Sequence, residues 1–134
     1  MTYYHGRSSS RPFYGNYIYI TPNPEYAVRY SNDSQVYECD LLCSLEKIFT
    51  LTNQDNLKLI ESIFGQETLD KIKGDEELDW SKLSYLSNDQ FESEEDFLKA
   101  HGFLGIKLKE QEKYVSFYIF DQSNVSLGKK IKVL

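Results

Sequence analysis

The sequence contains few of the residues on which metal binding and covalent catalysis usually depend. It has two cysteines, Cys39 and Cys43, and two histidines among its 134 residues. These four residues do not have the Cys/His spacing of a zinc site, so we expect no bound metal. Two cysteines also define no disulfide framework. We expect both to be free thiols in the core of a protein from a reducing compartment.

Long apolar runs and common catalytic motifs are missing as well. No stretch of about 18 apolar residues occurs, and the N-terminus lacks the apolar segment of a signal peptide. We therefore expect a cytoplasmic protein that is not bound to a membrane. The sequence also lacks a Ser/His/Asp arrangement and a phosphate-binding glycine loop. Its net charge of −6 argues against a general binder of DNA or RNA backbones, but it is compatible with a single bound nucleotide.

Tyrosine, in contrast, is abundant. Aromatic residues make up 15% of the chain, and eleven of them are tyrosines. A tyrosine combines a flat apolar ring with a hydroxyl group, which suits half-buried strands and flat ligands. The length is that of one domain, so we treat residues 1–134 as a single unit.

Two kinds of hydrophobic pattern divide this unit. Short aromatic or β-branched segments predict strands near residues 1–5, 16–21, 35–42, 47–51, 103–108, 114–121 and 130–134. The nearly unbroken apolar run before residue 121 predicts a central strand that is covered on both faces. Pro24 and the one-turn spacing of Tyr26 and Tyr30 predict a short helix. The order of elements predicts an α+β fold with split sheets and a helical insert at about 53–100, in which Ser93 caps the last helix.

Three short motifs could bind one ligand. The first is Tyr4-His5-Gly6, at the end of the first predicted strand. A histidine there can donate a hydrogen bond to a sugar hydroxyl, and the glycine lets the backbone approach a planar amide. A surface histidine on a chain terminus is the alternative.

The second motif pairs Tyr19 with Tyr30, eleven positions later. A strand followed by a packed helix can bring two such rings face to face around a flat, positively charged ring. The cation–π attraction would contribute about 0.5–2 kcal/mol. Packing of both rings in the core is the alternative.

The third motif is Glu110-Gln111-Glu112, just before the central strand. A carboxylate there can accept hydrogen bonds from a ribose hydroxyl and stabilise positive charge at a sugar carbon. A charged turn is the alternative. Together, the three motifs describe a site for a nucleotide whose cationic aromatic ring is attached to a ribose, and the nicotinamide half of NAD fits this description.

Several segments resemble the ADP-ribosyltransferase fold: YHG, GNYIYIT, PEYAVRYS, VYECDL, HGFLGIKL and FYIFDQSNV. They are most similar to its His-Tyr-Glu subgroup, which includes diphtheria-toxin-like and poly(ADP-ribose)-polymerase-like enzymes, and to small phage-encoded and polyvalent-protein transferases. The resemblance covers residues 3–41 and 100–125. It implies split sheets around an NAD cleft, with His5 on a ribose hydroxyl, Gly6 on the carboxamide, and Tyr19 and Tyr30 stacked on nicotinamide. The further NAD contacts that it implies are Tyr4, Arg7, Ser8 and Thr21.

The third position of the triad is less regular. Poly(ADP-ribose) polymerases carry a serine where this chain has Ala27, and alignment with their last motif puts Ser116 at the place of the catalytic glutamate. Other transferases of the fold have an E-x-E motif before this strand, which Glu110-Gln111-Glu112 resembles, with Glu112 as the catalytic member. We favour Glu112, so the expected catalytic set is His5, Tyr19, Glu110 and Glu112.

The resemblance implies a mono-ADP-ribosyltransferase that modifies a macromolecule, a protein rather than a nucleic acid. A phage effector that inhibits a host defence in the host cytoplasm would fit this size. The alternatives are an inactive NAD-binding or protein-binding module, which Ser116 at the third position would favour, and an NAD glycohydrolase.

Overall fold

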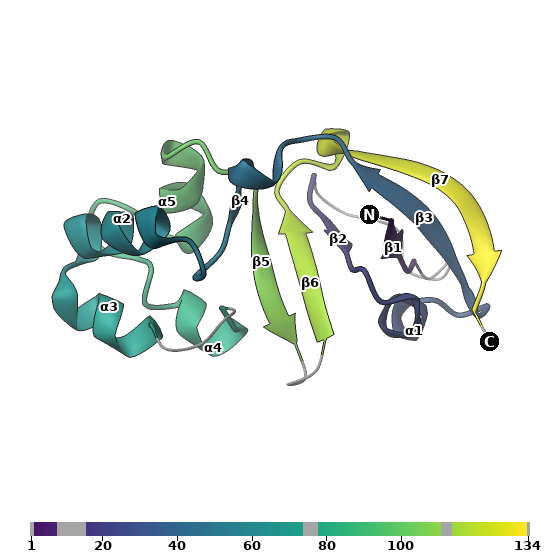
Figure 1. The fold of residues 1–134 in the computed structure, drawn as a ribbon, viewed down its shortest axis with the longest axis horizontal. Coiled ribbons are helices and arrows are strands. Elements are labelled where there is room, and N and C mark those ends of the chain that lie inside the picture. Colours follow the sequence, from purple (N-terminus) through teal and green to yellow (C-terminus); the bar gives the residue numbers. More distant parts are fainter. Residues whose placement is uncertain (1, 8–15, 74–77, 111–113, 134) are drawn as a thin grey trace.

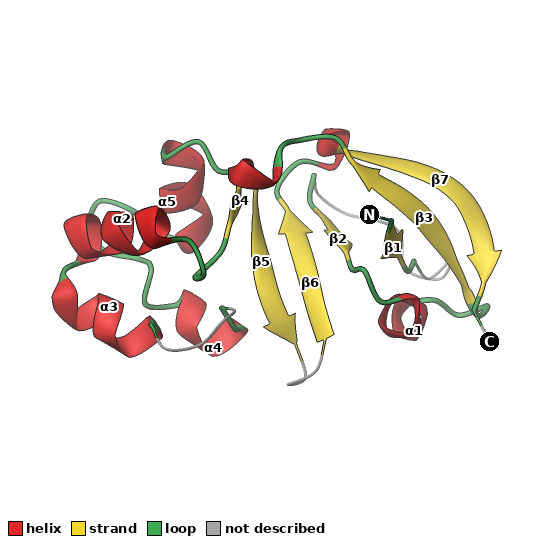
Figure 2. Cartoon of the chain, in the orientation of Figure 1, coloured by secondary structure: helices red, strands yellow, loops and turns green. Residues whose placement is uncertain are grey.

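The computed structural model describes residues 2–7, 16–73, 78–110 and 114–133, and the fold is mixed α+β (Figures 1 and 2). Two of the predicted site residues, Ser8 and Glu112, lie outside these ranges. The described strands form two sheets. The three-stranded sheet has the order β1-β3-β7, with β1 (Tyr3–His5), β3 (Gln35–Leu41) and β7 (Val125–Lys132). The four-stranded sheet has the order β2-β6-β5-β4, with β2 (Ile18–Ile20), β6 (Tyr114–Ile119), β5 (Gly105–Glu110) and β4 (Ile48–Phe49).

The helices fall into two groups. The short helix α1 (Pro24–Ala27) continues as a 3₁₀ turn, η1 (Val28–Tyr30), as the Pro24 pattern predicts. Four helices lie together beside the four-stranded sheet (Figure 1): α2 (Gln54–Phe64), α3 (Gln66–Ile72), α4 (Trp80–Leu83) and α5 (Glu94–Ala100). The remaining 3₁₀ turns are η2 (Leu45–Lys47) and η3 (Gln122–Asn124). The helical character predicted for 53–100 is therefore confirmed.

Local sequence explains where these helices begin. The Asn53 side chain accepts hydrogen bonds from the backbone amides of Asp55 and Asn56, which caps α2. The Ser93 hydroxyl accepts one from the amide of Asp96, so the predicted cap of α5 is confirmed. Each cap satisfies amides that the first helical turn leaves without an internal partner.

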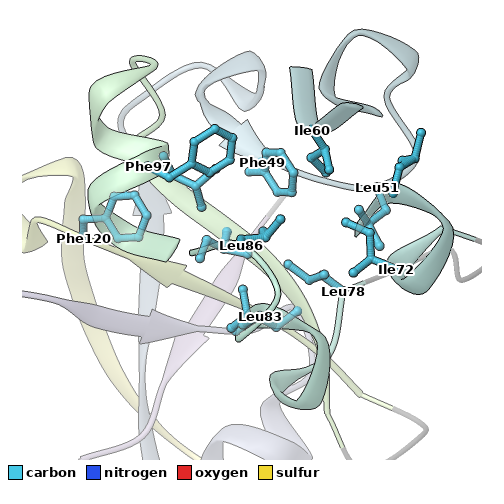
Figure 3. Close-up of a cluster of buried hydrophobic side chains, with 13 residues drawn as sticks. Phe49, Leu51, Ile60, Ile72, Leu78, Leu83, Leu86, Phe97 and Phe120 are labelled. Carbon is cyan, nitrogen blue, oxygen red and sulfur yellow. The ribbon is translucent and has the colours of Figure 1, made fainter. Parts of the chain in front are cut away.

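The four-stranded sheet separates two hydrophobic cores. Because strand side chains alternate, one face of β6 carries Phe117 and Ile119, which pack between the two sheets with Tyr3, Cys39 and Val125. The other face of this sheet packs on the helices through a larger cluster that includes Phe49, Ile60, Leu86, Phe97 and Phe120 (Figure 3). The prediction of a central strand covered on both faces is confirmed, because β6 pairs with β2 and β5 and its side chains pack against both cores.

Some predicted elements differ from the structure in detail. The last strand begins at Val125, five residues before the predicted start at 130, because it pairs with β3 along most of its length. Cys39 is buried as expected, whereas Cys43 is only partly buried, and both thiols are free. Among the described helices, none is long and apolar enough to cross a membrane.

The two sheets meet where β1 lies beside β2. The Tyr4 amide donates to the Thr21 carbonyl at 2.7 Å, and the Thr21 amide donates back to the Tyr4 carbonyl at 3.0 Å. This pair of bonds joins the edges of the two sheets. It also brings His5, the last residue of β1, next to Tyr19 in β2.

Candidate functional site

The histidine of the first motif is buried against β2. His5 is 5% exposed, and its Nδ1 lies 2.8 Å from the backbone carbonyl oxygen of Tyr19. Burial lowers the pKa of His5, outweighing the opposing effect of this hydrogen bond, and nearby Arg7 lowers it further. The ring is therefore neutral at pH 7. Because a carbonyl only accepts, the proton is on Nδ1, and Nε2 is the acceptor. The surface alternative is thus wrong, and a sugar hydroxyl would donate to this ring, not accept from it.

Glu110 is held by two hydroxyl groups from different parts of the chain. Its carboxylate accepts a hydrogen bond from Tyr26 in α1 and a second one from Ser116 in β6. Both donors are only 2% exposed. Hydrogen bonds to a charged acceptor are among the stronger ones in proteins, so this carboxylate has a defined orientation at the end of β5.

The hydrogen bond between Ser116 and Glu110 connects β6 to the neighbouring strand β5. In the β5–β6 pairing, Glu110 lies opposite Tyr114, and Ser116 lies opposite Leu108. Ser116 and Glu110 are therefore diagonal neighbours on the same face of the sheet. The Ser116 hydroxyl and the carboxylate of Glu110 on the adjacent strand therefore meet at one place on the sheet.

Tyr19 lies on this face as well. It pairs with Tyr118 of β6, and the two ring centroids are 4.9 Å apart with planes inclined by 38°. The pKa of the Tyr19 hydroxyl is well above its usual range, mainly because of burial and then through the nearby Tyr17, Glu110 and Tyr30.

Tyr30 is the exposed member of this group. It is 53% exposed, and its ring meets that of Tyr26 edge-on at a centroid distance of 5.5 Å. The two hydroxyl groups are 2.8 Å apart. The alternative of core packing is therefore wrong for Tyr30, which presents half of its surface to solvent beside Glu110.

Other predicted contacts have structural roles. A Cβ atom on Gly6 would lie 1.8 Å from the Ala27 carbonyl oxygen, so the missing side chain allows α1 to pack against β1. The Thr21 hydroxyl donates to the Val115 carbonyl at 2.7 Å. Tyr4 uses its backbone to join the sheets.

The sequence did not indicate the roles of Tyr26 and Tyr114. Their rings stack at a centroid distance of 4.6 Å with planes inclined by 16°, and the Arg29 guanidinium lies 4.9 Å from the Tyr114 ring. The one-turn spacing of Tyr26 and Tyr30 showed that they share a helix face. No pattern in the neighbouring sequence connected Tyr26 or Tyr30 to Glu110, which is 84 positions after Tyr26.

A separate cavity of about 380 Å³ lies on the opposite face of the four-stranded sheet. Tyr3, Ile48, Lys107, Val115 and Phe117 are among the residues that line it. Lys107, Val115 and Phe117 point away from Ser116 and Glu110, because neighbouring strand residues alternate between faces. The cavity is therefore not part of the group around Glu110.

Within the described ranges, no three His, Cys, Asp or Glu side chains gather as metal ligands. Comparisons with models of known protein families, with curated proteins and with solved structures find no match to this chain.

Proposed function

We propose that this protein binds NAD and transfers its ADP-ribose to a macromolecular target, on a fold of the ADP-ribosyltransferase type with two split sheets. The observation that carries the proposal is the carboxylate of Glu110, fixed by Tyr26 and Ser116 on the sheet face that also carries Tyr19. A neutral histidine is hydrogen-bonded to the backbone of that same tyrosine.

The residues present match the chemical groups of the nicotinamide riboside half of NAD. The partly exposed rings of Tyr19 and Tyr30 offer flat surfaces to a cationic ring. The Nε2 atom of His5 is the acceptor of the neutral ring but is buried, so a ribose hydroxyl would reach it only after neighbouring side chains move. The carboxylate of Glu110 would stabilise the positive charge that develops at the ribose C1′ atom.

In the reaction, the bond between C1′ and the nicotinamide nitrogen breaks, and its electron pair stays on the nitrogen. Nicotinamide therefore leaves as a neutral molecule. A nucleophile of the target forms the new bond to C1′ and loses one proton. We assign the carboxylate role to Glu110 in preference to Glu112, because Glu110 makes the contacts described above.

The charge distribution favours a protein target. Residues 53–100 contain thirteen Asp and Glu against five Lys and Arg, whereas the rest of the chain contains eight against ten. The helices beside the sheet are therefore strongly acidic. Such a surface repels the phosphates of a nucleic acid and attracts a basic protein surface.

The test is to incubate the purified protein with cell lysate and NAD labelled in its ADP-ribose part. We expect a labelled protein and free nicotinamide, and Glu110→Gln should reduce both by about 100-fold or more. Glu112→Gln should lose less activity than Glu110→Gln, and the reverse order would give the role to Glu112. Nicotinamide release without a labelled acceptor would indicate a glycohydrolase. Binding of NAD without release would indicate an inactive module.

A further inference from the structure

Tyr26 connects Tyr30 to Glu110 through a directional chain of hydrogen bonds. The Tyr26 hydroxyl has one proton, which it donates to the Glu110 carboxylate. The Tyr30 hydroxyl lies 2.8 Å from the Tyr26 oxygen, so it must be the donor in that second bond. The chain therefore runs from the half-exposed Tyr30, through the buried Tyr26, to the carboxylate.

Packing fixes the middle member of this chain. Tyr26 is 2% exposed, and its ring stacks on Tyr114 at 4.6 Å. The guanidinium of Arg29, in η1, lies 5.7 Å from the Tyr26 ring centroid. The pKa of the Tyr26 hydroxyl is far above its usual range, first because of burial and then because of its bonds to Glu110 and Tyr30. The hydroxyl therefore remains a proton donor at every pH at which the protein would act.

We propose that Tyr26 is a positioning residue that makes the orientation of Glu110 depend on Tyr30, the residue that stacks on the nicotinamide ring. This inference rests on the proposed function. A ligand ring against Tyr30 restricts the movement of that side chain, which strengthens its bond to Tyr26 and, through Tyr26, the bond to Glu110. The nicotinamide subsite and the carboxylate thus act as one unit.

Phenylalanine variants separate this role from stacking and from stability. Tyr26→Phe and Tyr30→Phe keep both rings and remove one hydroxyl of the chain each. Tyr85→Phe is the matched control, because it removes the hydroxyl of an exposed tyrosine whose ring lies beside Lys71 among the helices. For each variant, and for the Tyr26→Phe/Tyr30→Phe double variant, we would measure NAD affinity by calorimetry, nicotinamide release and thermal stability.

We expect Tyr26→Phe to slow nicotinamide release by about tenfold or more, because it removes a hydrogen bond to a charged group. Its affinity for NAD should change by less than about twofold, since the hydroxyl positions a group that acts in the transition state. Tyr30→Phe should cause a smaller loss, and the double variant should be no slower than Tyr26→Phe. The control should keep the wild-type rate within about threefold.

The inference is overturned if Tyr26→Phe releases nicotinamide at the wild-type rate, or if the two losses multiply in the double variant. Equal losses of rate and NAD affinity would also overturn it. If Tyr26→Phe does not fold, Tyr30→Phe is the deciding variant, because Tyr30 is half exposed and its replacement should not prevent folding. Nicotinamide release by Tyr30→Phe at the wild-type rate would then refute the hydrogen-bond chain. Failure of the wild-type protein to bind NAD or release nicotinamide would instead refute the proposed function.

Discussion

Replacing Gly6 with alanine tests the packing that brings α1 to the site. An added Cβ would lie 1.8 Å from the Ala27 carbonyl oxygen and 2.8 Å from its carbonyl carbon, whereas real Cβ contacts are essentially never closer than 3.0 Å. The end of β1 and the last turn of α1 must therefore separate by about 1.2 Å. Both atoms belong to backbone, so no flexible side chain can move aside. Overpacking of this kind costs about 1–3 kcal/mol.

For a chain of 134 residues, each kcal/mol corresponds to a fall in Tm of about 3–5 °C. Because α1 also carries Tyr26, the same movement would draw the Tyr26 hydroxyl away from Glu110, so nicotinamide release should fall as well. Differential scanning calorimetry and urea unfolding measure the first effect. Gly128→Ala is the control, because its Cβ would be 3.2 Å from the Glu38 carbonyl oxygen and needs a shift of only a few tenths of an ångström. If Gly6→Ala were as stable as the control, α1 would not pack against β1 as described.

Three further predictions concern stability and thiol reactivity. Because burial lowers the pKa of His5 below its usual value of 6.5, the unfolded state binds more protons just below that pH. The contribution of His5 to the free energy of unfolding should be complete above about pH 6.5 and decrease as pH falls, by up to about 1.4 kcal/mol per pH unit. In urea titrations at several pH values, His5→Gln should remove this pH dependence. Burial raises the pKa of the Cys39 thiol to about 12. Iodoacetamide at pH 8 should therefore label the partly buried Cys43 before Cys39, which mass spectrometry can follow. Equal labelling of the two thiols would contradict the burial of Cys39. Phe97 is 0% exposed between Phe64 and Phe91, so Phe97→Ala should reduce the free energy of unfolding by about 3–5 kcal/mol, and a loss below 1 kcal/mol would contradict the packing of the helical core.

The elements that follow from local rules could be predicted from the sequence. Apolar residues almost without a break identify β6 because both of its faces are covered. Ser93 satisfies amides of the helix that directly follows it, and Pro24 suits the first turn of α1. The start of β7 was placed too late, because its first half is mostly exposed and is held mainly by pairing with β3. The amino-acid sequence of a strand gives little indication of such pairing.

The contacts that define the candidate site depend on residues far apart in the sequence. The register between β5 and β6 decides that Ser116 meets Glu110, and a shift of one residue would turn one of these side chains to the other face. The role of Tyr26 depends on where α1, which follows β2 in the chain, packs in the fold. The sequence therefore indicated His5, Tyr19, Tyr30 and a carboxylate near residue 110, but not the hydroxyl groups that orient it.

The release of nicotinamide from NAD by the wild-type protein and by Glu110→Gln is the most direct test of the proposed chemistry. This variant keeps the size and shape of the side chain and removes its negative charge. Glu46→Gln, an exposed carboxylate in η2, is the matched control. We expect nicotinamide release by the wild-type and control proteins, and a loss of about 100-fold or more for Glu110→Gln with NAD still bound. Equal rates for Glu110→Gln and the wild-type protein would contradict the assignment of Glu110 as the residue that stabilises charge at the ribose.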